Sequence, residues 1–240
     1  MKRPLWWLVR KQREWLQERQ YTNPYHWSWR RSNALMYQLR TDVVLNLLGV
    51  HDENGSKRRL CLLDVGCGDA RFLADASGVT QAYGVDFSFR ALGFARQLAP
   101  QSAFARCSAT ALCFPDGKFD AVTLLDVIEH IPDELELQVM REAHRVLRPG
   151  GHVVVTTNTD QTPAEWKHYR HYSLPRFQQL FEGLFSPVRF VGMVPYFPTL
   201  RVWLQTPVVW NLARRRVRTC PPEKAHVIAG IGQKSYTTAA

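Results

Sequence analysis

The sequence predicts an α/β protein with a doubly wound, mostly parallel sheet. From residue 60 onward, short apolar segments alternate with amphipathic stretches of helical length, a pattern typical of βαβ units with right-handed crossovers. In the stretch Leu-Leu-Asp-Val-Gly-Cys-Gly-Asp-Ala-Arg at 62–71, an apolar strand runs into a glycine turn and then a helix. Ligands of such sheets bind beyond the carboxyl ends of the strands, so each loop that follows a strand is a candidate site.

The local patterns place the individual elements. Strands are expected at 60–65, 81–86, 102–106, 119–125, 151–157, 186–193 and 225–232. Helices are expected over 5–19, 32–49, 71–77, 88–98, 133–147 and 173–182. Residues 1–50 are therefore interpreted as a basic, Trp-rich helical extension, and residues 51–240 as one domain with an apolar and basic insert at 194–224.

Charge and cysteine content narrow the class of protein. The net charge is +10, with +7 in residues 1–40, +5 in residues 201–218 and −2 in the remainder, which indicates a docking surface at two segments and not a basic active site. The five cysteines are scattered without a Cys-x-x-Cys pair or zinc-like histidine spacing, which favours a reducing cytoplasm and no structural metal. No run reaches the roughly 18 apolar residues of a spanning helix.

The glycine turn does not suit a dinucleotide. That fingerprint needs glycine at its first, third and sixth positions, which here are Gly66, Gly68 and Arg71. Asp64 and Asp69 would also repel a pyrophosphate at close range. A cationic cofactor fits better, and S-adenosylmethionine, with its sulfonium and ammonium groups, matches a turn with acidic flanks and bare backbone.

Asp86 ends the second expected strand. At this place a carboxylate can accept hydrogen bonds from both ribose hydroxyls of a nucleoside, and it excludes a phosphate there. The alternative role for Asp86 is a helix N-cap, which Ser88 could fill instead.

Five motifs follow one another along the chain: Leu-Asp-Val-Gly-Cys-Gly-Asp-Ala, Gly-Val-Asp-Phe-Ser, Cys-Phe-Pro-Asp-Gly-Lys-Phe-Asp-Ala-Val, Asp-Val-Ile-Glu-His-Ile-Pro-Asp and Arg-Val-Leu-Arg-Pro-Gly-Gly-His. Together they resemble the class I S-adenosylmethionine-dependent methyltransferases, in particular the subgroup that includes ubiquinone-biosynthesis methylases. The resemblance covers residues 38–193 and the last strand. It implies a seven-stranded, Rossmann-like sheet with a final antiparallel hairpin.

The resemblance also assigns the cofactor contacts. Gly66 and Gly68 would pass beneath the methionine part, and Asp86 would hold the ribose. Arg40 matches an arginine that faces the cofactor carboxylate in the ubiquinone methylases, although a helical arginine is also commonly solvated. The expected cofactor residues are Arg40, Asp64, Gly66, Cys67, Gly68, Asp86, Phe87, Ser108, Ala109 and Leu125.

The chain departs from the family after its third strand. The acidic residue that usually accepts a hydrogen bond from the adenine amino group is missing, and Cys107-Ser108-Ala109 stands in its place. Ser108 can accept a weaker hydrogen bond. We therefore expect a lower cofactor affinity, with the same cofactor.

Asp126, Glu129 and His130 follow the fourth strand at spacings i, i+3 and i+4. This spacing places them on one side of a helical turn, where they could supply the base that takes a proton from a hydroxyl acceptor. The arrangement resembles the acid-acid-His set that ubiquinone O-methylases use with a divalent cation such as Mg²⁺. Two alternatives stay open: His130 acts alone as a neutral base, or the residues only support the loop.

The polar and aromatic cluster at 166–175 lies in the loop between the fifth strand and the next helix. In the family that the chain resembles, this loop often borders the acceptor pocket. His168, Tyr169, Arg170 and His171 are the candidate substrate residues for an acidic or phenolic group. A solvated loop, with Ser173 capping the next helix, explains the same residues.

Tryptophan and basic residues gather at 1–29 and 194–218, which suits an anionic lipid surface. The sequence thus predicts a cytoplasmic methyltransferase for a small lipophilic or hydroxylated acceptor, peripheral on the inner face of the membrane, with a lid formed by both segments. Packing of these residues on the core is the plain alternative. An RNA or tRNA methyltransferase and a non-catalytic cofactor-binding scaffold rank lower, because no RNA-binding motif is visible and the cofactor residues are intact.

Overall fold

A computed structural model describes residues 12, 15, 16, 18–27, 31–50, 60–76, 81–162, 167–193 and 219–236. The segments 1–11 and 194–218, which carry most of the expected membrane-facing tryptophans and arginines, lie outside these residues, as does Trp166. Every helix in the described ranges is too short or too polar to cross a membrane.

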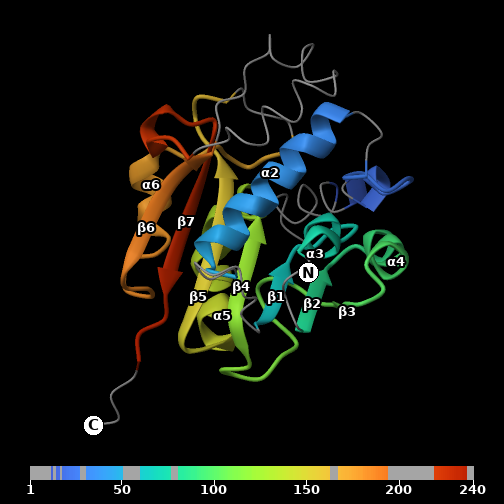
Figure 1. The fold of residues 1–240 in the computed structure, drawn as a ribbon, viewed down its shortest axis with the longest axis horizontal. Coiled ribbons are helices and arrows are strands. Elements are labelled where there is room, and N and C mark those ends of the chain that lie inside the picture. Colours follow the sequence, from blue (N-terminus) through green and yellow to red (C-terminus); the bar gives the residue numbers. More distant parts are fainter. Residues whose placement is uncertain are drawn as a thin grey trace, which may run out of the picture.

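A seven-stranded sheet forms the centre of the molecule, in the order β3-β2-β1-β4-β5-β7-β6 (Figure 1). The strands are β1 Cys61–Val65, β2 Gln81–Asp86, β3 Ala103–Arg106, β4 Phe119–Leu125, β5 Leu147–Asn158, β6 Val188–Met193 and β7 Val227–Gln233. β7 pairs antiparallel with both β5 and β6, and the other neighbours pair in parallel. The predicted doubly wound sheet with a final antiparallel hairpin is confirmed.

Helices cover both faces of the sheet. They are α2 Arg31–Leu47, α3 Arg71–Asp75, α4 Phe89–Leu98, α5 Glu136–Val146 and α6 Leu174–Gln179, with short 3₁₀ turns η1 Ile128–His130, η2 Asp133–Leu135 and η3 Pro222–Lys224. Apolar residues of α2, α3 and α4 share one buried cluster, and those of α5 and α6 share another. In Figure 1, α2 lies across the front of the sheet.

The strand sequences explain this two-sided burial. Leu62 and Leu63 of β1 are both fully buried, and they belong to the clusters on opposite faces of the sheet. Successive side chains of a strand point to opposite faces, so a strand covered on both sides needs a continuous apolar run. Asp64 shares the α2 face with Leu62, and this places its carboxyl group beneath the glycine turn.

Most helices and strands begin or end a few residues away from the sequence-based expectation. β5 begins at Leu147, earlier than expected, because Leu147 already pairs with Phe119 before the irregularity in the ladder. The helix expected from 133 begins as α-helix only at Glu136, since Asp133–Leu135 forms a 3₁₀ turn after Pro132. α3 ends at Asp75, two residues before the expected end.

The turn after β1 requires its glycines. Gly66 and Gly68 adopt φ values of 73° and 55°, which residues with a side chain rarely adopt. The amides of Gly66 and Cys67 both donate to the carbonyl of Val85, at 2.8 and 3.0 Å. A Cβ atom on Gly66 would lie 2.5 Å from Cγ2 of Val127, so this turn packs directly against the loop that follows β4.

We expect Gly66→Ala to destabilise the protein by about 2 kcal/mol or more, because the new methyl group meets both an unfavourable φ and the side chain of Val127. Gly93→Ala is the matched control: Gly93 lies in α4, and a Cβ there would meet nothing within 4 Å. That variant should be neutral or stabilising by about 0.5–1 kcal/mol. Urea unfolding measures both, and equal effects would contradict the role given to the turn.

Candidate functional site

Two adjoining cavities open at the carboxyl edge of the parallel strands. The larger, of about 210 Å³, extends from Asp86 at the end of β2 to His130 in η1. The smaller, of about 70 Å³, lies between α2 and the glycine turn. Gly66 and Asp126 line both cavities, so the two form one candidate site.

The structure brings most of the predicted cofactor residues to these cavities. The larger cavity is lined by Gly66, Asp86, Phe87, Ser108 and Ala109. The smaller is lined by Arg40, Asp64, Gly66, Cys67 and Leu125. Gly68 does not line either cavity; its amide instead donates to the carboxylate of Asp86.

The Asp86 carboxylate connects the turns after β1 and β2. Its two oxygens accept hydrogen bonds from the amides of Gly68 at 2.9 Å and Ser88 at 2.8 Å. Burial raises the pKa of Asp86, while these amides lower it. The N-cap role belongs to Ser88, whose hydroxyl accepts from the amide of Ala91 at 3.0 Å. Each Asp86 oxygen keeps a lone pair, which leaves the carboxylate able to accept from ribose hydroxyls.

Asp64, two residues before Gly66, is also buried. Thr123 of the neighbouring strand β4 donates to its Oδ1 at 2.7 Å. Burial raises the pKa of Asp64 to about 7, against the lowering effect of this hydrogen bond. A cation in the smaller cavity would favour the ionised form of Asp64.

Arg40 reaches the site from α2 and forms an ion pair with Asp126. The Thr156 hydroxyl donates to the other Asp126 oxygen at 3.0 Å. Nε of Arg40 is buried and has no hydrogen-bond partner among the described residues. Nε of Arg40 is therefore a donor that a ligand could use, as the predicted position of Arg40 beside the cofactor requires.

Asp126, Glu129 and His130 do not share one side of a helical turn, and that expectation is wrong. Asp126 has φ of +55°, so the chain leaves β4 in a left-handed conformation and enters a 3₁₀ turn. Asp126 faces Arg40 and Thr156, whereas Glu129 accepts from Thr157 at 3.0 Å and from Asn158 at 3.2 Å. The acid-acid-His set expected for Mg²⁺ is therefore not assembled.

Glu129 is fully buried and lies away from the cavity lining. Burial first, and then the charge of Asp126, raise the pKa of Glu129 well above its usual value. Its backbone carbonyl accepts from the amide of Tyr169 at 2.8 Å. Glu129 therefore holds the end of β5 and the loop after it against η1.

His130 lines the larger cavity. Burial first, and then the charges of His168 and Lys167, lower the pKa of His130 from 6.5 to about 4, so the ring is neutral at pH 7. Nδ1 lies 3.3 Å from the carbonyl oxygen of Lys167. Because a carbonyl oxygen can only accept, Nδ1 donates and Nε2 carries the lone pair.

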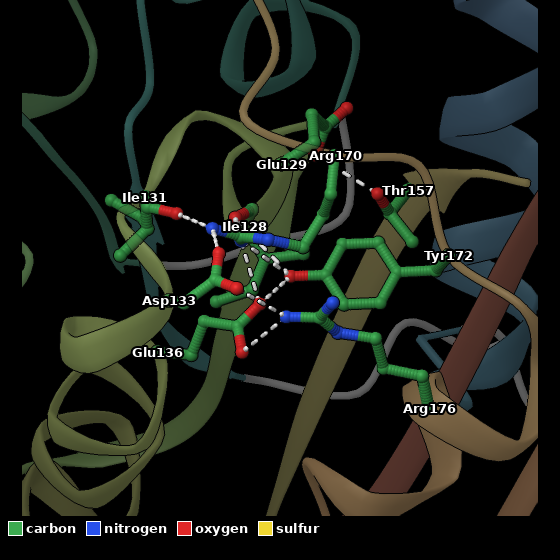
Figure 2. Close-up of polar contacts among 9 residues, drawn as sticks. All are labelled: Ile128, Glu129, Ile131, Asp133, Glu136, Thr157, Arg170, Tyr172 and Arg176. Carbon is green, nitrogen blue, oxygen red and sulfur yellow. Dashed lines mark hydrogen bonds and ion pairs between the residues drawn. The ribbon is translucent and has the colours of Figure 1, made fainter. Parts of the chain in front are cut away.

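Arg170 is a structural residue in this arrangement. Its guanidinium donates to the carbonyls of Ile128 and Ile131 and pairs with the carboxylates of Asp133 and Glu136 (Figure 2). The Arg170 side chain is 7 % exposed, and the residue does not line the cavity. The structure therefore gives no support to Arg170 as an acceptor contact.

Of the other predicted acceptor residues, one lines the larger cavity and two lie outside its lining. Tyr169 lines the larger cavity together with Lys167. His168 is buried, and its Nδ1 lies 2.7 Å from Nε2 of His171. His171 in turn places Nδ1 2.8 Å from the carbonyl oxygen of Thr162.

Sequence reasoning missed the contribution of residues 18–27. Asp69 was expected to face a cationic ligand, but its two oxygens accept from the amide and the ring Nδ1 of His26, at 2.8 and 2.9 Å. Tyr21 lines the larger cavity, and its hydroxyl would lie 2.6 Å from a Cβ on Gly68. Trp27 donates to the carbonyl of Asp69 at 3.2 Å. The sequence shows that this segment is rich in aromatic residues, but it does not show that the segment packs against the glycine turn.

The family model of the methyltransferase domain matches residues 63–155. A crystal structure of the N-methyltransferase NodS from Bradyrhizobium japonicum, in complex with S-adenosylhomocysteine, covers 93% of this chain and 99% of its own, with a TM-score of 0.64 and 15% identity. Residues 63–155 of this chain thus form a methyltransferase domain. At 15% identity, the likeness of this methyltransferase domain to NodS concerns the fold alone.

Sequence relatives of the methyltransferase domain include two named enzymes. A demethylmenaquinone methyltransferase from Lysinibacillus sphaericus is 37% identical over 130 residues, which are 50% of this chain and 55% of the relative. A tocopherol O-methyltransferase from Arabidopsis thaliana is 34% identical over 122 residues, which are 47% of this chain and 34% of the relative. The chain thus spans about half or less of the length of these curated relatives.

Asp64 should make the unfolding free energy of the ligand-free protein depend on pH. Its pKa in the folded state, about 7, exceeds the usual value of about 3.9 for an unfolded chain, so the folded state binds more protons between these values. Stability from this group is full below about pH 4 and is lost as the pH rises through about 7. Between pH 5 and 7.5 the original protein should lose on the order of 2 kcal/mol of unfolding free energy from this group. Asp64→Asn keeps an acceptor for Thr123 but does not titrate, so this loss should be absent in the variant. Urea unfolding at both pH values tests this, and identical pH slopes in the two proteins would contradict it.

Proposed function

We propose that this protein transfers the methyl group of S-adenosylmethionine to a hydroxylated, lipophilic acceptor. The observation that carries the proposal is the shared cavity: the ribose-type carboxylate Asp86 and the neutral imidazole His130 line the same space. A cofactor held at one end would therefore meet a proton acceptor at the other.

The cofactor end fits S-adenosylmethionine in three respects. Asp86 keeps lone pairs for ribose hydroxyls, and its anchored position excludes a phosphate there. The buried Nε of Arg40 lacks a described partner and suits the carboxylate of the methionine part. Asp64, beneath the smaller cavity, is a counter-charge for an ammonium or sulfonium group.

The acceptor end combines an apolar wall with polar groups. Val127, Ile131, Pro132 and Leu135 line it, beside His130, Lys167 and Tyr169. An apolar wall suits the body of a lipophilic acceptor, and the polar groups suit its hydroxyl. The relatives named for demethylmenaquinone and tocopherol support an acceptor of this class.

When bound, S-adenosylmethionine supplies an electrophilic methyl group on a good leaving group. Nε2 of His130 accepts the hydroxyl proton of the acceptor, the resulting oxyanion forms the new bond to the methyl carbon, and the electron pair of the broken carbon–sulfur bond stays on sulfur. In a phenolic acceptor, deprotonation enriches both the oxygen and the ring carbons in electrons. The same base therefore serves O- and C-methylation.

The sequence analysis predicts contact with a membrane through the basic and aromatic residues at 1–29 and 194–218. Trp27 packs within the protein, bonded to Asp69 and stacked on Arg71 with its guanidinium 4.8 Å from the ring, whereas Trp15 is 54% exposed. We propose peripheral contact with an anionic membrane through Trp15 and the flanking basic residues. Flotation with anionic vesicles, before and after removal of residues 1–20, tests this: the full chain should float and the shortened chain should float less, and equal recovery in both would contradict it.

Substitution of His130 tests the proposed chemistry. His130→Gln should lower kcat for a prenylated hydroquinone by about 10²–10⁴, because the variant lacks the proton acceptor. Its affinity for S-adenosylhomocysteine should stay within about threefold of the original, since the ribose anchor is intact. His144→Gln, in α5 and outside the cavity lining, is the control.

Transfer of labelled methyl to a total cell extract distinguishes the acceptor classes. We expect the label in the lipid fraction. Label in the nucleic-acid fraction would favour an RNA methyltransferase, and cofactor binding without any transfer would favour a scaffold; either result would overturn the proposal.

A further inference from the structure

Two histidines and a buried carboxylate meet at the acceptor end of the larger cavity. Glu129, His130 and His168 each offer one ligand atom, and these atoms all lie within 4.8 Å of one another. The imidazole rings of His130 and His168 are 4.7 Å apart between centroids. This cluster shares Glu129 and His130 with the acid-acid-His set that the sequence suggested, but His168, from the loop after β5, stands in place of Asp126.

The hydrogen bonds fix which nitrogen of each ring can bind a cation. The carbonyl of Thr162 can only accept, so Nδ1 of His171 donates to it and Nε2 of His171 is the nitrogen that accepts. His168 must then donate from Nδ1 to His171, and this leaves the lone pair of His168 on Nε2. His130 likewise donates from Nδ1 to the carbonyl of Lys167 and keeps its lone pair on Nε2.

The third group is held in place from behind. Thr157 and Asn158 donate to the two oxygens of Glu129, and each oxygen keeps a further lone pair. Figure 2 shows Glu129 beside Thr157, and it shows Arg170 bonded to Ile128 of η1 and to Asp133 of η2. Partners of this kind orient metal-binding side chains and set their affinity.

We propose that Glu129, His130 and His168 bind a zinc-class divalent cation. Two imidazole nitrogens and one carboxylate form a ligand set that suits Zn²⁺ or Co²⁺, whereas Mg²⁺ and Ca²⁺ prefer oxygen ligands. Three protein ligands leave a fourth position for water or an acceptor oxygen. Of the three ligands, His130 lines the larger cavity, so the site borders the space for the acceptor.

Metal binding has a consequence for methyl transfer. The cation uses the same Nε2 lone pair of His130 that accepts the proton in the proposed reaction, so the two uses exclude each other. Zinc therefore suppresses the His130-dependent transfer. This consequence rests on the proposed function, but the binding of the metal does not.

Calorimetric titration of chelator-treated protein with Zn²⁺ tests the binding. We expect one site with a dissociation constant below about 1 μM, at least 100-fold weaker in His168→Ala. His171→Ala should weaken binding about 10–100-fold, because it removes the partner that orients His168. His144→Ala is the matched control and should leave the affinity unchanged. Thermal unfolding of each variant checks that it is folded.

A second readout uses Co²⁺ in place of Zn²⁺. A four-coordinate site with two imidazoles should give visible absorption bands that His168→Ala abolishes. Binding weaker than about 10 μM, or an unchanged affinity in His168→Ala, would overturn the metal site. If the chelator-treated protein transfers methyl groups but binds no zinc, the metal site alone is wrong; if it binds zinc but transfers no methyl group, the proposed function is wrong.

Discussion

The carboxylate of Asp86 is the interaction on which the geometry of the site depends. It accepts hydrogen bonds from the amides of Gly68 and Ser88, and so it joins the turn after β1 to the turn after β2. A buried carboxylate costs free energy unless donors surround it, and backbone amides are strong donors for this purpose. The sheet register supplies the arrangement, because Val65 pairs with Val85 and both strands end at the same edge. The proposed cofactor site is thus a property of two adjacent parallel strands.

The second constraint is the left-handed residue Asp126. It turns the chain sharply at the end of β4, and the amide of Asp126 donates to the carbonyl of Thr156 in β5 at 3.1 Å. The carboxylate of Asp126 then meets Arg40 from α2, so a helix on one face of the sheet is linked to the loop that carries His130. One chain of contacts therefore connects the proposed acceptor end of the site with its proposed cofactor end.

Local sequence patterns predicted the features that depend on neighbours in the chain. β2 and β4 begin and end at the residues expected from their apolar runs, and Ser88 caps α4 as its hydroxyl and position suggested. Most of the predicted cofactor residues lie on the cavities because they follow strands of a parallel sheet. Contacts between distant segments were not predictable in this way. His26 donates to Asp69, 43 residues further along the chain. Arg170 pairs with Asp133 and Glu136, which precede it by more than thirty residues. Spacing alone also misplaced Asp126, since helical geometry fails where one residue adopts a positive φ.

Calorimetric titration with S-adenosylhomocysteine tests whether Asp86 holds the ribose of S-adenosylmethionine. Asp86→Asn keeps the shape of the side chain but removes the negative charge and one acceptor. Asp116→Asn is the control, because it removes the same charge from a side chain that is 79% exposed. The account predicts an affinity about 10–100-fold lower for Asp86→Asn, with the control unchanged. An Asp86→Asn protein that unfolds at the original temperature and binds with the original affinity would contradict the claim.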